Sequence, residues 1–227
     1  MKLPYSGYLR RPAGSVLLYY ITDRRQFPGG PEQQKKRLLD KIAECVAGGV
    51  AYVQLREKDL STHALEELGK AAAALFPERS HSKLLINSRT DVALACGAHG
   101  VHLPANDITA SEARAIFGRC GKAYPVIGAS VHSVDELSYA EAHAADFAVF
   151  GPVFEKDGHS IGDGLKQLER ACHKPDRSMP VLALGGITLK NARRCLEAGA
   201  DGIAAIRLFQ ENDVAGISTQ LRQLKLP

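Results

Sequence analysis

The chain has 227 residues, of which 45% are hydrophobic and 24% charged, and its formal net charge is +4. This composition is typical of a globular domain, and the scattered positive charge favours a pocket for a small anion over a nucleic-acid partner. No apolar run reaches about 18 residues, so we expect no membrane-spanning helix. Five dispersed cysteines without a C-x-x-C motif indicate reduced thiols in a cytoplasmic protein rather than disulfides or zinc.

Alternating strand and helix patterns organise the rest of the chain. Residues 1–15 lack the apolar core of a signal peptide, so we expect a flexible leader, followed by a single domain over 16–227. Strands separated by helices pair in parallel through right-handed crossovers, and eight such units predict a (β/α)8 TIM barrel. Short apolar runs predict the eight strands at 16–21, 52–55, 83–86, 100–103, 126–129, 147–150, 181–184 and 202–205.

Polar side chains recur at every second position where the second predicted strand ends. Gln54, Arg56 and Lys58 share one face of an extended chain, whereas Leu55 and Glu57 point to the other face. Cationic groups inside a barrel are costly unless they meet water, a ligand or a carboxylate. The pattern therefore predicts an anion clamp for a phosphate or carboxylate, with an internal salt bridge to a neighbouring strand as the alternative.

Polar residues also follow the third and fourth predicted strands. Asn87 and Arg89 come after the third strand, and Asp107 comes after the fourth. We take all three as candidates for substrate binding and Asp107 also as a candidate metal ligand. Turn and helix-capping roles are the alternatives, because Thr109 and Glu112 have the spacing of a capping box directly after Asp107.

His132 lies in the turn after the fifth predicted strand. Ser133 and Glu136 form an S-x-x-E capping box, so a helix begins there and His132 falls at the carboxyl end of the strand. Barrel enzymes place catalytic side chains at that end, and histidine transfers protons near neutral pH. His132 is therefore the candidate catalytic residue and Ser130 a candidate substrate contact, with a surface histidine in a turn as the alternative.

The last three predicted strands are followed by loops that suit a ligand. Residues 155–164 are polar and glycine-rich, which indicates a loop that covers the substrate. Gly185 and Gly186 follow the seventh strand and allow a ligand close to the backbone, and Ile206 and Arg207 follow the eighth. Barrels of this kind bind phosphate at these two loops, so we predict a phosphate site there, with a tight turn as the alternative.

Together these motifs resemble the thiamine phosphate synthase superfamily, from residue 17 to residue 209. The resemblance implies a (β/α)8 barrel, in agreement with the strand count. It rests on six phrases in a fixed order: Tyr20–Arg24 (YITDR), Gln54–Lys58 (QLREK), Gly100–Leu103 (GVHL), Gly151–Phe154 (GPVF), Leu184–Ile187 (LGGI) and Ala198–Gly202 (AGADG).

The synthase branch of this superfamily joins a pyrimidine diphosphate to a thiazole phosphate and releases pyrophosphate with Mg²⁺. Its usual residues are Asn-Asp after strand three, Asp after strand four and Thr-x-Thr-Lys after strand six. Asn87 and Asp107 match, but Ser88 replaces the first metal-binding Asp, residues 155–160 lack the Thr-x-Thr-Lys loop, and Arg207 replaces a serine. Loss of one carboxylate weakens the neutralisation of Mg²⁺ at such a site.

At the positions where the chain departs from the synthase motifs, it resembles the thiazole tautomerase branch of the superfamily. Its members carry a Ser-Val-His-Ser phrase, whose histidine shuttles the proton, and a Phe-Glu-x-Asp loop; this chain has both, at 130–133 and 154–157. Residues 87–89 are similar to the Asn-Gly-Arg of that branch. The resemblance implies an isomerase that converts a carboxythiazole phosphate into its aromatic tautomer by a 1,3-proton shift at His132.

We therefore expect a tautomerase that takes a small thiazole phosphate and uses neither a metal nor another cofactor. One alternative is thiamine phosphate synthase, in which Asp107, Asn87 and Arg56 hold the magnesium diphosphate and the pyrimidine. The other is a non-catalytic ligand-binding barrel, because one fold hosts many functions. The sequence does not decide whether the chain is a monomer or a homo-oligomer.

Overall fold

The computed structural model describes residues 16–155 and 162–224. Eight parallel strands form a closed barrel in which each strand pairs with the next and β8 pairs with β1. The strands are β1 (Leu17–Ile21), β2 (Tyr52–Leu55), β3 (Lys83–Asn87), β4 (Gly100–Leu103), β5 (Val126–Val131), β6 (Phe147–Phe150), β7 (Val181–Leu184) and β8 (Gly202–Ala205). The predicted (β/α)8 barrel is confirmed, and each strand begins and ends within two residues of the expected position.

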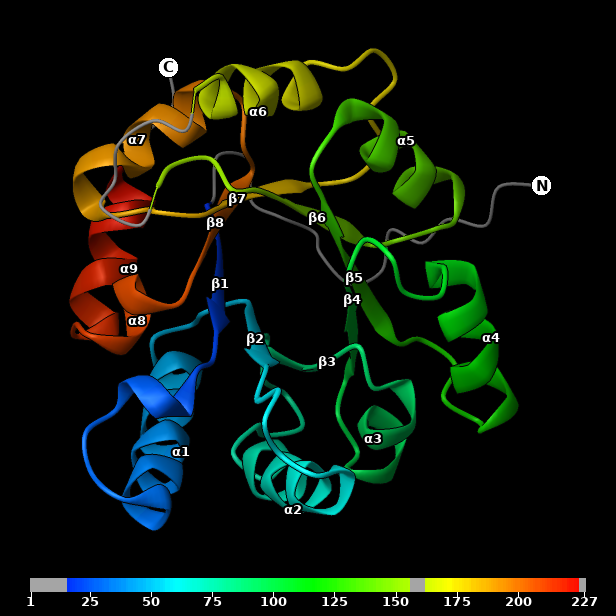
Figure 1. The fold of residues 1–227 in the computed structure, drawn as a ribbon, viewed down its shortest axis with the longest axis vertical. Helices are drawn as coiled ribbons and strands as arrows, with labels where there is room; N and C mark the ends of the chain where they lie inside the picture. Colours follow the sequence, from blue (N-terminus) through cyan, green and yellow to red (C-terminus); the bar gives the residue numbers. More distant parts are fainter. Residues whose placement is uncertain (1–15, 156–161, 225–227) are drawn as a thin grey trace.

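Helices surround the barrel and cover the outer face of the sheet (Figure 1). They are η1 (Arg24–Gln26), α1 (Pro31–Ala47), α2 (Thr62–Ala73), α3 (Thr90–Ala95), α4 (Ala110–Arg119), α5 (Val134–Ala142), α6 (Gly164–Cys172), α7 (Leu189–Glu197), α8 (Arg207–Gln210) and α9 (Val214–Gln223). Among the described residues, no helix is long and apolar enough to cross a membrane. The predicted leader, 1–15, and residues 156–161 of the predicted substrate loop lie outside the described residues.

Side-chain caps fix where helices begin. The predicted capping box of α4 is present, because Thr109 accepts the Glu112 N–H and the Glu112 carboxylate accepts the Thr109 N–H. Ser133 caps α5 as predicted, with the Glu136 N–H donating to its hydroxyl. The second half of that box is different, because the Glu136 carboxylate accepts the N–H of His132 at 2.7 Å. Glu136 therefore holds the backbone of the candidate catalytic residue.

Large and small side chains fill the barrel interior in matched pairs. The Tyr52 and Phe147 rings stack with their centroids 4.4 Å apart, and the Tyr19 ring packs edge-on against both. Gly128 on β5 leaves space for Phe147, because a Cβ there would lie 2.5 Å from the end of the ring. This packed interior closes the barrel below the ends of the strands, so a ligand site can form only at its mouth.

Candidate active site

A cavity of about 680 Å³ opens at the carboxyl ends of the strands. Six of the residues predicted from the sequence contribute to its wall: Arg56, His132, Gly185, Gly186, Ile206 and Arg207. Apolar side chains from β7, β8 and the turn after β6 complete the wall, including Leu184, Ile187 and Pro152. A planar apolar ring with an anionic group therefore matches the chemistry of this cavity.

The backbone of the turn after β7 packs closely against the backbone of the turn after β6. Gly185 and Gly186 have φ values of +105° and +57°, and a Cβ on Gly186 would lie 1.8 Å from the Glu155 carbonyl oxygen. Only glycine fits such a close approach in this left-handed conformation. Asn191 in α7 also holds the turn, since its amide donates to the Gly186 carbonyl and its oxygen accepts the Thr188 N–H. No sequence pattern pointed to Asn191.

His132 contributes its ring to the cavity from the end of β5. Its Nδ1 is hydrogen-bonded to the Gly151 carbonyl oxygen. Since a carbonyl only accepts, Nδ1 carries the proton in the neutral ring and Nε2 carries the lone pair. The backbone of His132 is also fixed, through the Glu136 carboxylate. The histidine is thus oriented from two sides with Nε2 as its basic atom.

The three residues of the predicted anion clamp take different positions. Arg56 lines the cavity and makes no ion pair with a carboxylate among the described residues, so the alternative of an internal salt bridge finds no support there. Gln54 is buried, and its Nε2 has no partner within that part of the chain. Lys58 is exposed and does not line the cavity. Glu57 does point to the other face, as predicted, and is buried beside Thr22.

Arg89, Asp107 and their neighbours lie apart from the large cavity. Arg89 turns its guanidinium to the Asp91 carboxylate and the Thr62 hydroxyl. The Ser88 hydroxyl donates to Oδ2 of Asp107, whose Oδ1 accepts the Ile108 N–H. Within 16–155 and 162–224, no three histidine, cysteine or acidic side chains gather as a metal site. Asn87, at the end of β3, is half-buried and does not line the cavity either.

Ser130 points to a buried histidine on the neighbouring strand. Its Oγ lies 2.9 Å from Nε2 of His102, and burial lowers the pKa of His102 to about 3. His102 Nδ1, Tyr19 Oη and Gln54 Nε2 are all buried without a partner in the described part of the chain. These three polar atoms belong to inward-facing positions of β4, β1 and β2. Because its residue type is ordinary for a packed strand, the sequence did not single out Tyr19 as a candidate site residue.

Known proteins match this chain over most of its length. A family model described as thiamine monophosphate synthase matches residues 18–209. The putative thiamine-phosphate synthase 2 of Aquifex aeolicus is 37% identical and covers 86% of this chain and 97% of its own. The putative thiamine-phosphate synthase of Geobacter sulfurreducens is 42% identical, over 83% and 84% respectively.

A solved structure shows the same relationship. Thiamine phosphate pyrophosphorylase from Pyrococcus furiosus has a TM-score of 0.74 and 33% sequence identity to this chain. The similarity covers 93% of this chain and 96% of that one. The chain therefore belongs to the thiamine monophosphate synthase family and is an enzyme of thiamine biosynthesis.

Proposed function

We propose that the enzyme is a tautomerase that converts a carboxylated, non-aromatic thiazole phosphate into its aromatic isomer. The observation that carries the proposal is the position of His132, whose Nδ1 is held by the Gly151 carbonyl while its ring lines the cavity shared with Gly185 and Gly186. A base with its lone pair on a fixed atom, beside a turn suited to a phosphate, is what a proton shift within a bound ring requires.

In this mechanism His132 acts first as a base and then as an acid. Nε2 removes the proton from the ring carbon, the double bonds shift by one position, and the same nitrogen delivers a proton to the exocyclic carbon. No electrons are gained or lost overall, and aromatisation supplies the driving force. Because no diphosphate leaves, the reaction does not call for Mg²⁺.

The remaining residues of the cavity hold the substrate. Gly185 and Gly186, together with Ile206 and Arg207, would bind the phosphate, largely through backbone N–H groups. Arg56 would face the carboxylate or the developing charge of the ring. We retain five more residues as proposed substrate contacts near the open end of the barrel: Gln54, Lys58, Asn87, Arg89 and Ser130. They would reach the substrate only if it extends beyond the large cavity.

Thiamine phosphate synthase is the second candidate, and the names of the relatives favour it over the tautomerase. In that reaction Asp107, Asn87 and Arg56 would hold a diphosphate and Mg²⁺, which would neutralise the charge of the leaving group. Asp107 is the one carboxylate of this set, and the hydroxyl of Ser88 and the N–H of Ile108 occupy its two oxygens. Both oxygens of the carboxylate that would ligate Mg²⁺ are therefore already hydrogen-bonded, and these residues suit Mg²⁺ poorly unless those hydrogen bonds break.

Incubation of the purified protein with the non-aromatic thiazole carboxylate phosphate, followed by NMR in the presence of a chelator, tests the proposal. We expect fast aromatisation by the wild type and a loss of about 10²-fold or more in His132→Asn, which still binds the product. Equal rates in the two proteins would contradict the role of His132. If the wild type does not exceed the blank, the pyrimidine diphosphate, the thiazole phosphate and Mg²⁺ are added; pyrophosphate release would identify a synthase. Tight binding without turnover in either assay would identify a binding protein.

A further inference from the structure

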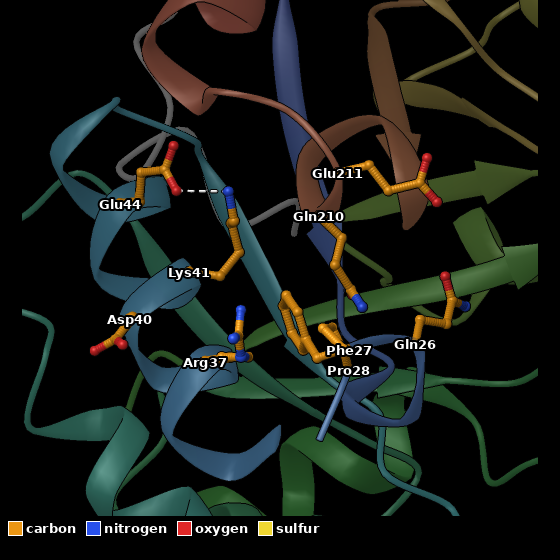
Figure 2. A pocket seen from close by; sticks show the side chains of 9 residues that line it. All are labelled: Gln26, Phe27, Pro28, Arg37, Asp40, Lys41, Glu44, Gln210 and Glu211. Atoms are coloured by element: carbon orange, nitrogen blue, oxygen red, sulfur yellow. Dashed lines mark ion pairs between the residues drawn. The ribbon is translucent and has the colours of Figure 1, made fainter. Parts of the chain in front are cut away.

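The short helix η1 is a thin wall between two cavities. Gln26, its last residue, lines the active-site cavity on one side and a second hollow of about 550 Å³ on the other. Figure 2 shows the residues that line this outer hollow: Phe27 lies between the side chains of α1 and Gln210 of α8, and Gln26 lies on the side away from α1. None of the three residues of η1 is buried. Since apolar packing does not hold this wall, its polar contacts must do so.

Three hydrogen bonds from Arg24 converge on one buried carboxylate, that of Glu57, whereas the amide of Gln26 donates to the Asp23 carboxylate at 2.8 Å. Only 4% of Glu57 is exposed. Its Oε1 accepts the Thr22 hydroxyl at 2.5 Å, and both of its oxygens accept the Arg24 N–H. The Arg24 guanidinium donates a hydrogen bond to Oε2 of Glu57 at 3.0 Å and two more to the Asp59 carboxylate, each at 2.7 Å. We call these four residues, Thr22, Arg24, Glu57 and Asp59, the Glu57 network.

The same network reaches Arg56. The backbone N–H of Arg56 donates to the Thr22 hydroxyl oxygen at 3.0 Å, and the Thr22 N–H donates to the Gln54 carbonyl. The Thr22 hydroxyl therefore accepts a hydrogen bond from the N–H of Arg56, which lines the cavity, and donates one to Glu57. The backbone of Arg56 and the first residue of η1, Arg24, are thus both fixed by way of one carboxylate.

Two further hydrogen bonds, both made by Gln210, connect the end of β1 and the residues after it to α8. The amide of Gln210 donates to the Asp23 carbonyl at 2.8 Å, and its oxygen accepts the Tyr20 hydroxyl at 2.9 Å. Gln210 ends the short helix that begins at Arg207, on the phosphate side of the cavity. Residues 22–24 are thus tied to α8 through the Asp23 carbonyl and to Glu57 through Thr22 and Arg24.

We propose that Glu57 is a positioning residue, which fixes the backbone of Arg56 through Thr22 and the start of η1 through Arg24, and so sets how Arg56 lines the active-site cavity. The inference rests on the proposed function only in taking that cavity as the active site. Burial raises the pKa of Glu57, and the hydrogen bonds from Thr22 and Arg24 oppose that shift, so placing this carboxyl group here carries a desolvation cost. A buried ion pair is weak evidence for stability, and orientation of Arg56 through Thr22 accounts for its placement.

Matched substitutions at Thr22 test the proposal. Thr22→Val keeps the shape of the side chain but removes the oxygen between Arg56 and Glu57, whereas Thr22→Ser keeps that oxygen. We expect the Arg56 amide to exchange with solvent at least about tenfold faster in Thr22→Val and in Glu57→Gln, and not in Thr22→Ser. Amides inside β1 and β2 serve as the control for folding. Unchanged exchange at Arg56 would overturn the proposal, and this measurement needs no substrate.

A double-mutant cycle with Arg56→Ala separates positioning from general stability. Thr22→Val alone should lower kcat/KM about tenfold, mainly through KM, and Thr22→Ser should restore it. In the Arg56→Ala background the same change should cost less than about twofold, because its target is gone. Additive losses would show a merely structural role and overturn the inference. If the wild type turns nothing over, the proposed function fails, and the cycle is run on the dissociation constant of thiazole phosphate instead.

Discussion

The hydroxyl of Ser88 donates its hydrogen bond to Oδ2 of Asp107, across the space between the turns after β3 and β4. Ser88 has a φ of +63°, which is uncommon for any residue other than glycine but is tolerated by Asp and Asn. Oδ1 of the same carboxylate accepts the Ile108 N–H at 2.8 Å. The carboxylate is therefore satisfied by neutral donors of the protein itself.

Replacement of this serine by aspartate should create a cation site. Ser88→Asp places a second carboxylate beside Asp107 without adding backbone strain, and two carboxylates attract a divalent ion where one does not. We expect the affinity for Mn²⁺, measured by titration calorimetry, to rise about tenfold or more. Ser88→Asn, with the same shape and no charge, is the control. A similar gain in both variants would mean that charge at this position is not what limits binding.

Gly186 should tolerate no side chain. Gly186→Ala would place its Cβ 1.8 Å from the Glu155 carbonyl in a left-handed conformation, so the turn must move. We expect a loss of at least about 2 kcal/mol in the free energy of unfolding and a tenfold weaker affinity for thiazole phosphate. Gly97→Ala is the matched control, since Gly97 has a φ of +71° and open space around it. It should cost only about 1 kcal/mol and leave affinity unchanged. Equal effects of the two variants would argue against contact with Glu155 as the cause.

Stability should fall below neutral pH because of His102. Burial lowers the pKa of His102 to about 3, whereas an unfolded histidine titrates near 6.5, so the unfolded chain binds a proton that the folded one rejects. The free energy of unfolding should therefore decrease as the pH drops from about 6.5 toward 3. The slope per buried histidine reaches about 1.4 kcal/mol per pH unit. His99, whose pKa burial lowers to about 4, acts in the same direction.

Urea unfolding at pH 7, 6 and 5 measures this slope. His102→Gln should lower the slope of the unfolding free energy against pH by the equivalent of about one proton taken up on unfolding. His63→Gln, at an exposed position, should leave that slope as in the wild type. An unchanged slope in His102→Gln would show that another group dominates.

Removal of Glu136 should slow turnover. Glu136→Ala leaves the His132 N–H without its acceptor and frees the backbone that carries the His132 ring. We expect kcat to fall about three- to tenfold, with KM little changed. Glu136→Gln keeps an oxygen that can accept the N–H and should retain most of the activity. If both variants lose activity alike, the negative charge rather than the hydrogen bond is required.

The fold follows from the sequence because the barrel repeats one local pattern eight times. Each strand is a short apolar run followed by polar or glycine residues, so its carboxyl end, and with it His132 and Gly185, could be placed in advance. The glycine turn after β7 and His132 meet in one cavity for that reason. Positions set by alternation alone, such as Arg56 and Glu57, were also assigned to the correct faces.

Side-chain partners chosen across strands could not be predicted. Arg89 turns to Asp91 and Thr62, which removes it from the cavity, and its place in sequence is the same for either orientation. Glu57 is found only when β1 and β2 lie side by side, because its partners Thr22 and Arg24 are more than thirty residues away. Pairwise distances of this kind depend on register and rotamers, which a single sequence does not encode locally.

The packing of Gly128 under the Phe147 ring links two positions that lie nineteen residues apart in the chain. A side chain at 128 has no room unless 147 shrinks and the His102 ring, whose Nδ1 would lie 2.8 Å from a Cβ there, also shifts; a small residue at 147 leaves a void unless 128 grows. Neither site can drift alone without a loss of stability. Divergent members of the family should therefore exchange volume between these positions, and any variant with a larger residue at 128 should carry a smaller one at 147.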